Sequence, residues 1–186
     1  MTVASEPAVA ELTTTEAAVL ALLQLEGEHS GYELQKLAAK SIAHVWSPAR
    51  SGLYAVLPRL ERDGLVSSRP VSQATRPAKQ LYTITAAGTG ALHAWLTRVE
   101  PGATANFHLK LFLGGLTTPD VLLRHLEQLR EDIDARLERY REIEETNTNR
   151  GHDWYHRHML VFGIERAEHE LAWVDRLERA LREGPQ

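Results

Sequence analysis

Basic side chains gather in one part of a chain that is acidic overall. Residues 46–80 hold six lysines and arginines against two acidic residues, whereas the 186-residue chain has a net charge of -4. Ammonium and guanidinium groups bind phosphates and carboxylates. The segment therefore predicts an anionic partner, such as a nucleic-acid backbone. Its basic residues are Arg50, Arg59, Arg62, Arg69, Arg76 and Lys79.

Other chemistries find less support in the sequence. The chain has no cysteine, which excludes disulfides and thiolate catalysis. We find no nucleophile beside a base, no paired carboxylates in a cleft-forming context and no glycine-rich phosphate loop, so we expect neither an enzyme nor a cofactor. His152 and His156 would share one helix face, as metal ligands do. Without a third ligand, solvated or structural histidines are the default, and a metal-responsive regulator is the alternative.

Residues 50–65, RSGLYAVLPRLERDGL, have the period of an amphipathic helix. The exposed face begins with the small side chains of Ser51 and Ala55 and ends with arginine. Pro58 lies inside this helix, where it removes a hydrogen bond and predicts a bend. Gly64 is placed to end it. The apolar stripe that must be buried is Leu53, Val56, Leu57 and Leu60.

The neighbouring segments predict a winged helix-turn-helix around this helix. Thr13 with Glu16, and Ser30 with Glu33, have the spacing of capping boxes and would open two earlier helices. After residue 64, LVSSRPV and KQLYTIT alternate, or nearly so, around a basic turn, which indicates a β-hairpin. Thr85 would then cap a fourth helix. The expected fold is mainly α with a small β-hairpin.

Such a fold would place the helix of residues 50–65 in the major groove of DNA. Ser51 and Ala55 would let the helix approach the base edges. Two alternatives stay open: a basic helix that is merely solvated, and a winged module that binds an acidic protein instead of DNA. The other contacts are assigned by position: Arg50 to a guanine edge or a phosphate, Tyr54, Arg59 and Arg62 to the flanking backbone, and Arg76 and Lys79 to the minor groove or its phosphates.

The C-terminal half is acidic and helical. A linker at residues 99–105 separates the winged domain, residues 12–98, from a helical domain at residues 106–182, and residues 1–11 form a loose arm. Apolar positions at threes and fours form a seam that would pair either two copies on a palindromic operator or two helices of one chain. The expected dimerisation residues are Leu122, Leu126, Leu129, Ile133, Leu137, Tyr140, Ile164 and Leu171.

Large aromatic side chains could line a pocket for a small apolar or aromatic effector between the two domains, although such residues also serve as plain core. They are Trp95, Phe107, Phe112, Trp154 and Trp173. The chain has no secretory signal and no apolar stretch of the roughly 18 residues that a membrane span needs. We therefore expect a cytoplasmic, nucleoid-associated protein with no membrane partner.

Four segments in this order resemble the PadR family of bacterial transcriptional regulators: SGYELQK, GLYAVLPRLERDGLV, RPAKQLYTITAAG and FHLKLFLGG. The resemblance covers about residues 12–181 and is to the branch with a virulence-activator-type C-terminal helical domain. It implies a homodimer with DNA contacts from the helix of Ser51 and Tyr54 and from the wing of Lys79. It also implies repression that a small molecule relieves. Many members have proline directly after the recognition-helix tyrosine, whereas this chain has Ala55 there and proline at position 58.

Overall fold

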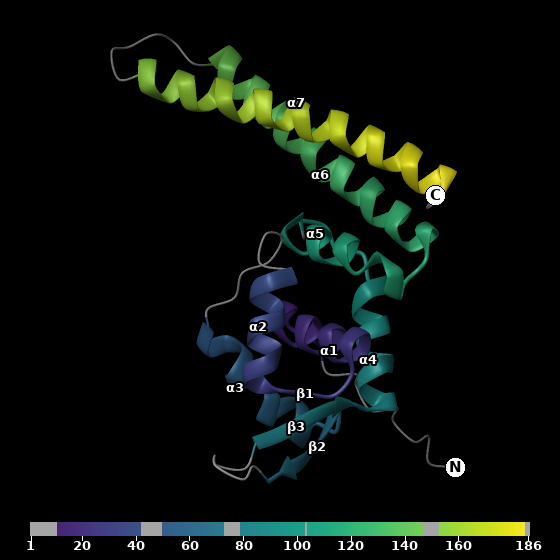
Figure 1. Cartoon of the computed structure of the whole chain (residues 1–186). Coiled ribbons are helices and arrows are strands. Elements are labelled where there is room, and N and C mark those ends of the chain that lie inside the picture. Colours follow the sequence, from purple (N-terminus) through teal and green to yellow (C-terminus); the bar gives the residue numbers. More distant parts are fainter. Residues whose placement is uncertain (1–10, 42–49, 73–78, 103, 147–152, 185–186) are drawn as a thin grey trace, which may run out of the picture. The chain divides into compact units, whose positions relative to one another are not determined.

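The chain folds into two compact units (Figure 1). The computed structural model describes residues 11–41, 50–72, 79–102, 104–146 and 153–184. The first unit comprises residues 1–98 and 108–116, and the second comprises residues 99–107 and 117–186. Residues 108–116, which lie inside the helical domain predicted at residues 106–182, group with the first unit by their contacts.

The first unit is built around helix α1, Thr14–Glu26. Thr13 and Glu16 form the predicted capping box, in which the Thr13 backbone N–H donates to Glu16 Oε2 at 2.8 Å. Residues 17–23 are buried on every side of this helix. Helices α2, Gly31–Ser41, α3, Arg50–Arg62, and α4, Ala86–Thr97, surround it. Leu109 and Leu113, in and just after α5, Thr104–Phe112, complete the same core.

The wing is a three-stranded antiparallel sheet with the order β1-β3-β2. The hairpin strands are β2, Val66–Val71, and β3, Lys79–Ile84, and their register pairs Val66 with Ile84 and Val71 with Lys79. This confirms the predicted hairpin. Strand β1, His29–Ser30, was not predicted, because two residues carry no readable alternation. It pairs with β3 and so attaches the wing to the start of α2.

The second unit is a helical hairpin of α6, Pro119–Thr146, and α7, Asp153–Glu183. The predicted leucine seam of α6 is buried against α7 within one chain; for example, Leu126 and Ile133 are only 2% and 1% exposed. Ion pairs run along the hairpin from Arg130 with Glu178 to Arg136 with Glu170, so the two helices are antiparallel. Among the described helices, none combines the length and apolar character needed to cross a bilayer.

The contact between α4 and the segment that joins α3 to β2 depends on Gly88. A Cβ atom at this position would lie 2.1 Å from the carbonyl oxygen of Leu65 and 2.8 Å from Cγ1 of Ile84. The Gly88 backbone N–H also donates to Oγ1 of Thr85, the N-cap of α4, at 3.0 Å. Glycine lowers helix propensity, but here it permits a backbone approach that no other residue allows.

We expect Gly88→Ala to lower the free energy of unfolding by about 1–3 kcal/mol, because backbone atoms must move to admit the methyl group. Gly90 is the matched control in the same helix, since a Cβ there meets nothing within 4 Å. Gly90→Ala should raise the free energy of unfolding by about 0.5–1 kcal/mol. Urea unfolding followed by circular dichroism measures both. Equal effects of the two substitutions would contradict the close approach.

Candidate nucleic-acid interface

Helix α3 is held by its apolar face and keeps its other face in solvent. Leu53, Leu57 and Leu60 are buried, as the periodicity predicted. The helix continues through Pro58, and Gly64, with a φ of 72°, follows its end. The backbone N–H of Leu65 then donates to the carbonyl of Leu60 at 2.8 Å, which closes the helix end.

The exposed face of α3 keeps part of its predicted character. Tyr54 is 45% exposed, Ala55 is exposed, and the Arg62 side chain is 73% exposed and forms a surface ion pair with Asp63, with Nε 3.9 Å from Oδ1. These side chains are exposed to solvent on one face of the helix. The side chains of Arg50 and Ser51 and all of Arg76 lie outside the described residues, so their predicted contacts stay predictions.

Arg59 has a contact that the sequence did not predict. Its Nε donates to Oε1 of the buried Glu16 at 2.6 Å, which fastens α3 to the first turn of α1. Burial on its own raises the pKa of the Glu16 carboxyl, but hydrogen bonds from Thr13 and Arg59 outweigh it and leave the pKa below its ordinary value. The predicted contact of Arg59 with a DNA backbone stays a prediction, and the bond to Glu16 adds a contact that fastens α3 to α1.

Glu33 joins the start of α2 to the wing. Its Oε2 accepts hydrogen bonds from the backbone N–H of Ser30 at 2.8 Å and from Ser30 Oγ at 2.6 Å, which is the predicted capping box. Its Oε1 accepts from Lys79 Nζ at 2.9 Å. The hydrogen bonds from Ser30, with that from Lys79, lower the pKa of Glu33 to about 2, so the carboxyl is ionised at neutral pH.

The far side of the wing is fastened in the same way. Arg69 Nε donates to Glu28 Oε1 at 2.7 Å, and the guanidinium makes a second bond to the other carboxylate oxygen. Thr83 also donates to Glu28. Two of the six basic residues counted in the sequence, Arg69 and Lys79, therefore hold the wing in place. Such pairs reduce the charge that the wing offers to another molecule.

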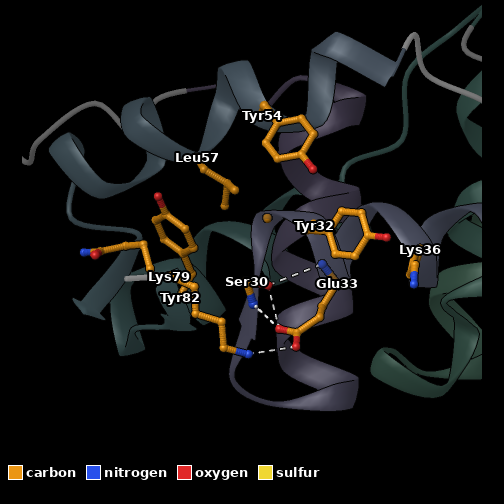
Figure 2. A pocket seen from close by; sticks show the side chains of 10 residues that line it. Ser30, Tyr32, Glu33, Lys36, Tyr54, Leu57, Lys79 and Tyr82 are labelled. Atoms are coloured by element: carbon orange, nitrogen blue, oxygen red, sulfur yellow. Dashed lines mark hydrogen bonds and ion pairs between the residues drawn. The ribbon is translucent and has the colours of Figure 1, made fainter. Parts of the chain in front are cut away.

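A hollow of about 560 Å³ opens where α2, α3 and β3 meet (Figure 2). Tyr54 lies at its edge and donates from its hydroxyl to Gln35 Oε1 at 3.3 Å. Lys36 Nζ lies 4.7 Å from the centroid of the Tyr32 ring, in a cation–π contact. The residues that line it include Tyr32, Tyr54, Tyr82, Lys36, Lys79 and Glu33.

Family models match both parts of the chain. Residues 19–94 match the Transcriptional regulator PadR-like family, and residues 105–182 match the Virulence activator alpha C-term domain. The chain belongs to the PadR family. Its C-terminal part is of the virulence-activator type. The fold, a winged helix-turn-helix followed by a helical domain, is thereby confirmed as predicted.

Individual relatives of this PadR-family chain are transcriptional regulators and not enzymes. It is 27% identical over 168 residues to the Negative transcriptional regulator PadR of Bacillus subtilis, which covers 85% of this chain and 92% of that one. It is 27% identical over 175 residues to a probable transcriptional regulator of Mycobacterium tuberculosis, covering 85% and 93%. In the crystal structure of Bacillus subtilis PadR in complex with operator DNA, the matched chain is 24% identical in sequence to this chain. The match covers 91% of this chain and 99% of that chain, with a TM-score of 0.46.

The aromatic residues predicted to line an effector pocket belong to different units of this PadR-family chain. Trp95 is buried in the first unit, where Lys110 Nζ lies 4.8 Å from its ring centroid. Phe107 and Trp173 meet edge to face in the second unit, with centroids 6.0 Å apart. Phe112 and Trp154 are exposed. The pocket stays a prediction.

The predicted dimerisation residues lie on α6 and α7, and His156 of the predicted histidine pair lies on α7. Leu122, Leu126, Leu129, Ile133 and Leu137 are buried within the chain, and Tyr140 lies against Gly163. Ile164 and Leu171 are half-buried on α7. His156 is exposed, and His152 lies outside the described residues. No group of three or more potential metal ligands occurs among the residues that the structure describes.

Sequence reasoning missed Tyr32 and Lys36. Both are exposed on α2 at the hollow. Their spacing of four residues places them on one helix face, and this signal was available in GYELQK. The charge count overlooked Lys36 because the basic segment was taken to begin at residue 46.

Proposed function

We propose that the chain is a homodimeric repressor that binds a palindromic operator through α3, the start of α2 and the wing. The observation that carries this proposal is the exposed face of α3, which runs from Ala55 to Arg62 beside a wing that Glu33 and Lys79 hold to α2. Repression is supported by the relative named as a negative regulator.

The shape of this face suits a DNA groove. An α-helix fits the major groove of B-form DNA when the side chains near its N-terminal end are small enough to let it approach. Ala55 meets this need, and the exposed Arg62 at the other end of the helix can reach a phosphate. Contacts to phosphates set affinity and register, whereas contacts to base edges set sequence preference. We therefore assign Arg62 to affinity and Ala55 to sequence preference.

The proposed dimer uses a surface other than the leucine seam, because the seam is filled within one chain. Tyr155, Met159 and Phe162 follow each other at spacings of four and three residues along α7 and are 71%, 66% and 56% exposed. Trp154 and Ile143 are also exposed in this unit. A contiguous exposed apolar stripe of this kind marks an interaction surface. A second copy with the same stripe would cover it and bring two winged units to one palindrome.

The proposed effector is a small apolar or aromatic molecule. It would relieve repression by favouring one arrangement of the two recognition helices over another, and its effect is limited by its difference in affinity for the two arrangements. The candidates for its walls remain the aromatic residues predicted from the sequence.

DNA binding is tested by duplex titrations at several salt concentrations. We expect the affinity of the parent protein for DNA to fall steeply as the salt concentration rises. Arg62→Ala should weaken binding to all duplexes alike and reduce the log–log salt slope by about one for each protomer bound to the duplex. Ala55→Arg should change the preference for operator over unrelated duplex. Arg124→Ala, an exposed arginine of the second unit, is the matched control and should leave the slope unchanged. A parent protein that binds no duplex at low salt would overturn the proposal.

The dimer is tested by placing a charge on the exposed stripe. We expect Phe162→Asp to shift the sedimentation equilibrium from dimer toward monomer, because an aspartate buried in the interface has no partner. Its circular dichroism spectrum should match the parent, since Phe162 is 56% exposed within the chain. Leu25→Asp is the control, an equally exposed apolar residue of the first unit at 51%. A parent that sediments as a monomer, or a Phe162→Asp variant that stays dimeric, would contradict this interface.

A further inference from the structure

The hollow between α2, α3 and β3 is lined by groups that donate hydrogen bonds. Its lining includes three tyrosines, Tyr32, Tyr54 and Tyr82, and two lysines, Lys36 and Lys79. Glu33, the carboxylate of the lining, is already bound by Ser30 and Lys79. A lining of this composition suits an anion that accepts several hydrogen bonds.

Lys36 supplies the charge that the hollow has to offer. Lys79 is neutralised by Glu33, 2.9 Å away. Lys36 is exposed and rests its ammonium over the Tyr32 ring, and no carboxylate in the described part of the chain forms an ion pair with it. The ring holds the ammonium near the hollow without satisfying its three N–H donors. The cation is therefore positioned and still able to bind an anion.

The tyrosine at the edge of the hollow is fixed before any partner arrives. A Cβ atom on Gly31 would lie 3.1 Å from Cε1 of Tyr54 and 3.1 Å from Cδ1 of Leu57, so the Tyr54 ring lies directly on the backbone of α2. Its hydroxyl is held by Gln35. Side chains that are ordered in advance bind at a lower entropic cost. The backbone N–H groups of Ser30 and Glu33 are used by the capping box and are not available to a partner.

The exposure of these walls favours an extended partner over a small molecule. Sites for small organic ligands bury most of the ligand surface. Here Tyr32 is 58% exposed and Tyr54 is 45% exposed, so a small ligand would stay largely in water (Figure 2). The first helix of a helix-turn-helix crosses the DNA backbone when the second lies in the major groove. The hollow lies between these two helices and the wing, where a backbone strand would pass.

We propose that this hollow seats one backbone phosphate of the operator, with Lys36 providing the charge, Tyr32 providing a hydroxyl donor, and Tyr54, whose hydroxyl is held by Gln35, providing a fixed wall. The inference rests on the proposed DNA binding and adds to it a site that the basic residues of the 46–80 segment do not include. Lys79 acts there as a positioning residue that keeps the wing against Glu33.

The test compares two lysines of one helix in duplex titrations over a range of salt concentrations. Lys36→Gln should weaken binding to every duplex by the same factor, on the order of five- to tenfold. It should also reduce the log–log salt slope by about one for each protomer bound to the duplex. Lys40→Gln is the matched control, because it makes the same charge change one helical turn beyond the hollow. Tyr32→Phe, which removes only a hydroxyl, should weaken binding and leave the slope almost unchanged.

A second measurement identifies the phosphate itself. Operator duplexes, selected by the parent protein from random sequence, carry a neutral methylphosphonate at one position at a time. At one position in each half-site, the methylphosphonate should weaken binding of the parent. The same change should not weaken binding of Lys36→Gln any further, because that variant already lacks the lysine that would contact this phosphate. Equal losses for both proteins at every position would overturn the proposed seat.

The outcomes separate this site from the proposed function. If the parent binds no duplex, DNA binding itself fails. If the parent binds with a steep salt dependence while Lys36→Gln and Lys40→Gln reduce the slope equally, or not at all, DNA binding stands and the phosphate seat is wrong. If Lys36→Gln binds DNA as the parent does but loses the response to an added aromatic acid, the hollow holds a small organic anion and the seat is likewise wrong.

Discussion

The carboxylate of Glu33 is the contact on which the candidate DNA-binding surface depends. It caps the start of α2 through Ser30 and holds the wing through Lys79, and these two tasks use different oxygens of one side chain. The backbone pairing between the same elements is short, because β1 has only two residues. The wing is also held by that pairing, by the apolar core and by the bonds of Arg69 and Thr83 to Glu28. The bond from Lys79 to Glu33 adds a direct tie between the wing and the start of α2, which makes these two elements one candidate surface.

The internal ion pairs change which basic residues are available to DNA. Arg59 is bound to Glu16, Arg69 to Glu28 and Lys79 to Glu33, and each pair fastens one element of the first unit to another. A charge count along the sequence treats all of them as free. Arg62 on α3 and Lys36 and Lys40 on α2 are exposed and take no part in these three pairs. In the proposed function, positioning and recognition are thus assigned to different basic residues.

The sequence predicted features that depend on neighbouring residues and missed those that depend on distant ones. Both capping boxes, the helix end at Gly64 and the hairpin follow from spacings of a few residues, and the structure confirms them. The partners of Arg59 and Lys79 are 43 and 46 residues away in the chain, and no periodicity reports such pairs. The leucine seam was read correctly as apolar, but period alone cannot decide whether a second copy or α7 covers it. Gly88 lowers helix propensity, and the close contact with Leu65 that requires a glycine there cannot be read from the sequence.

The central claim is best tested by a carbon-detected NMR titration of the Glu33 side-chain carboxyl. The hydrogen bonds from Ser30, followed by that from Lys79, should lower its pKa from the ordinary 4.5 to about 2. The stabilisation that this shift represents is therefore present above the ordinary value and is lost as the pH falls toward 2. The account predicts a Glu33 carboxyl that is still ionised at pH 3.5 in the folded protein. A titration midpoint near 4.5 would show that Glu33 does not join α2 to the wing and would contradict the account.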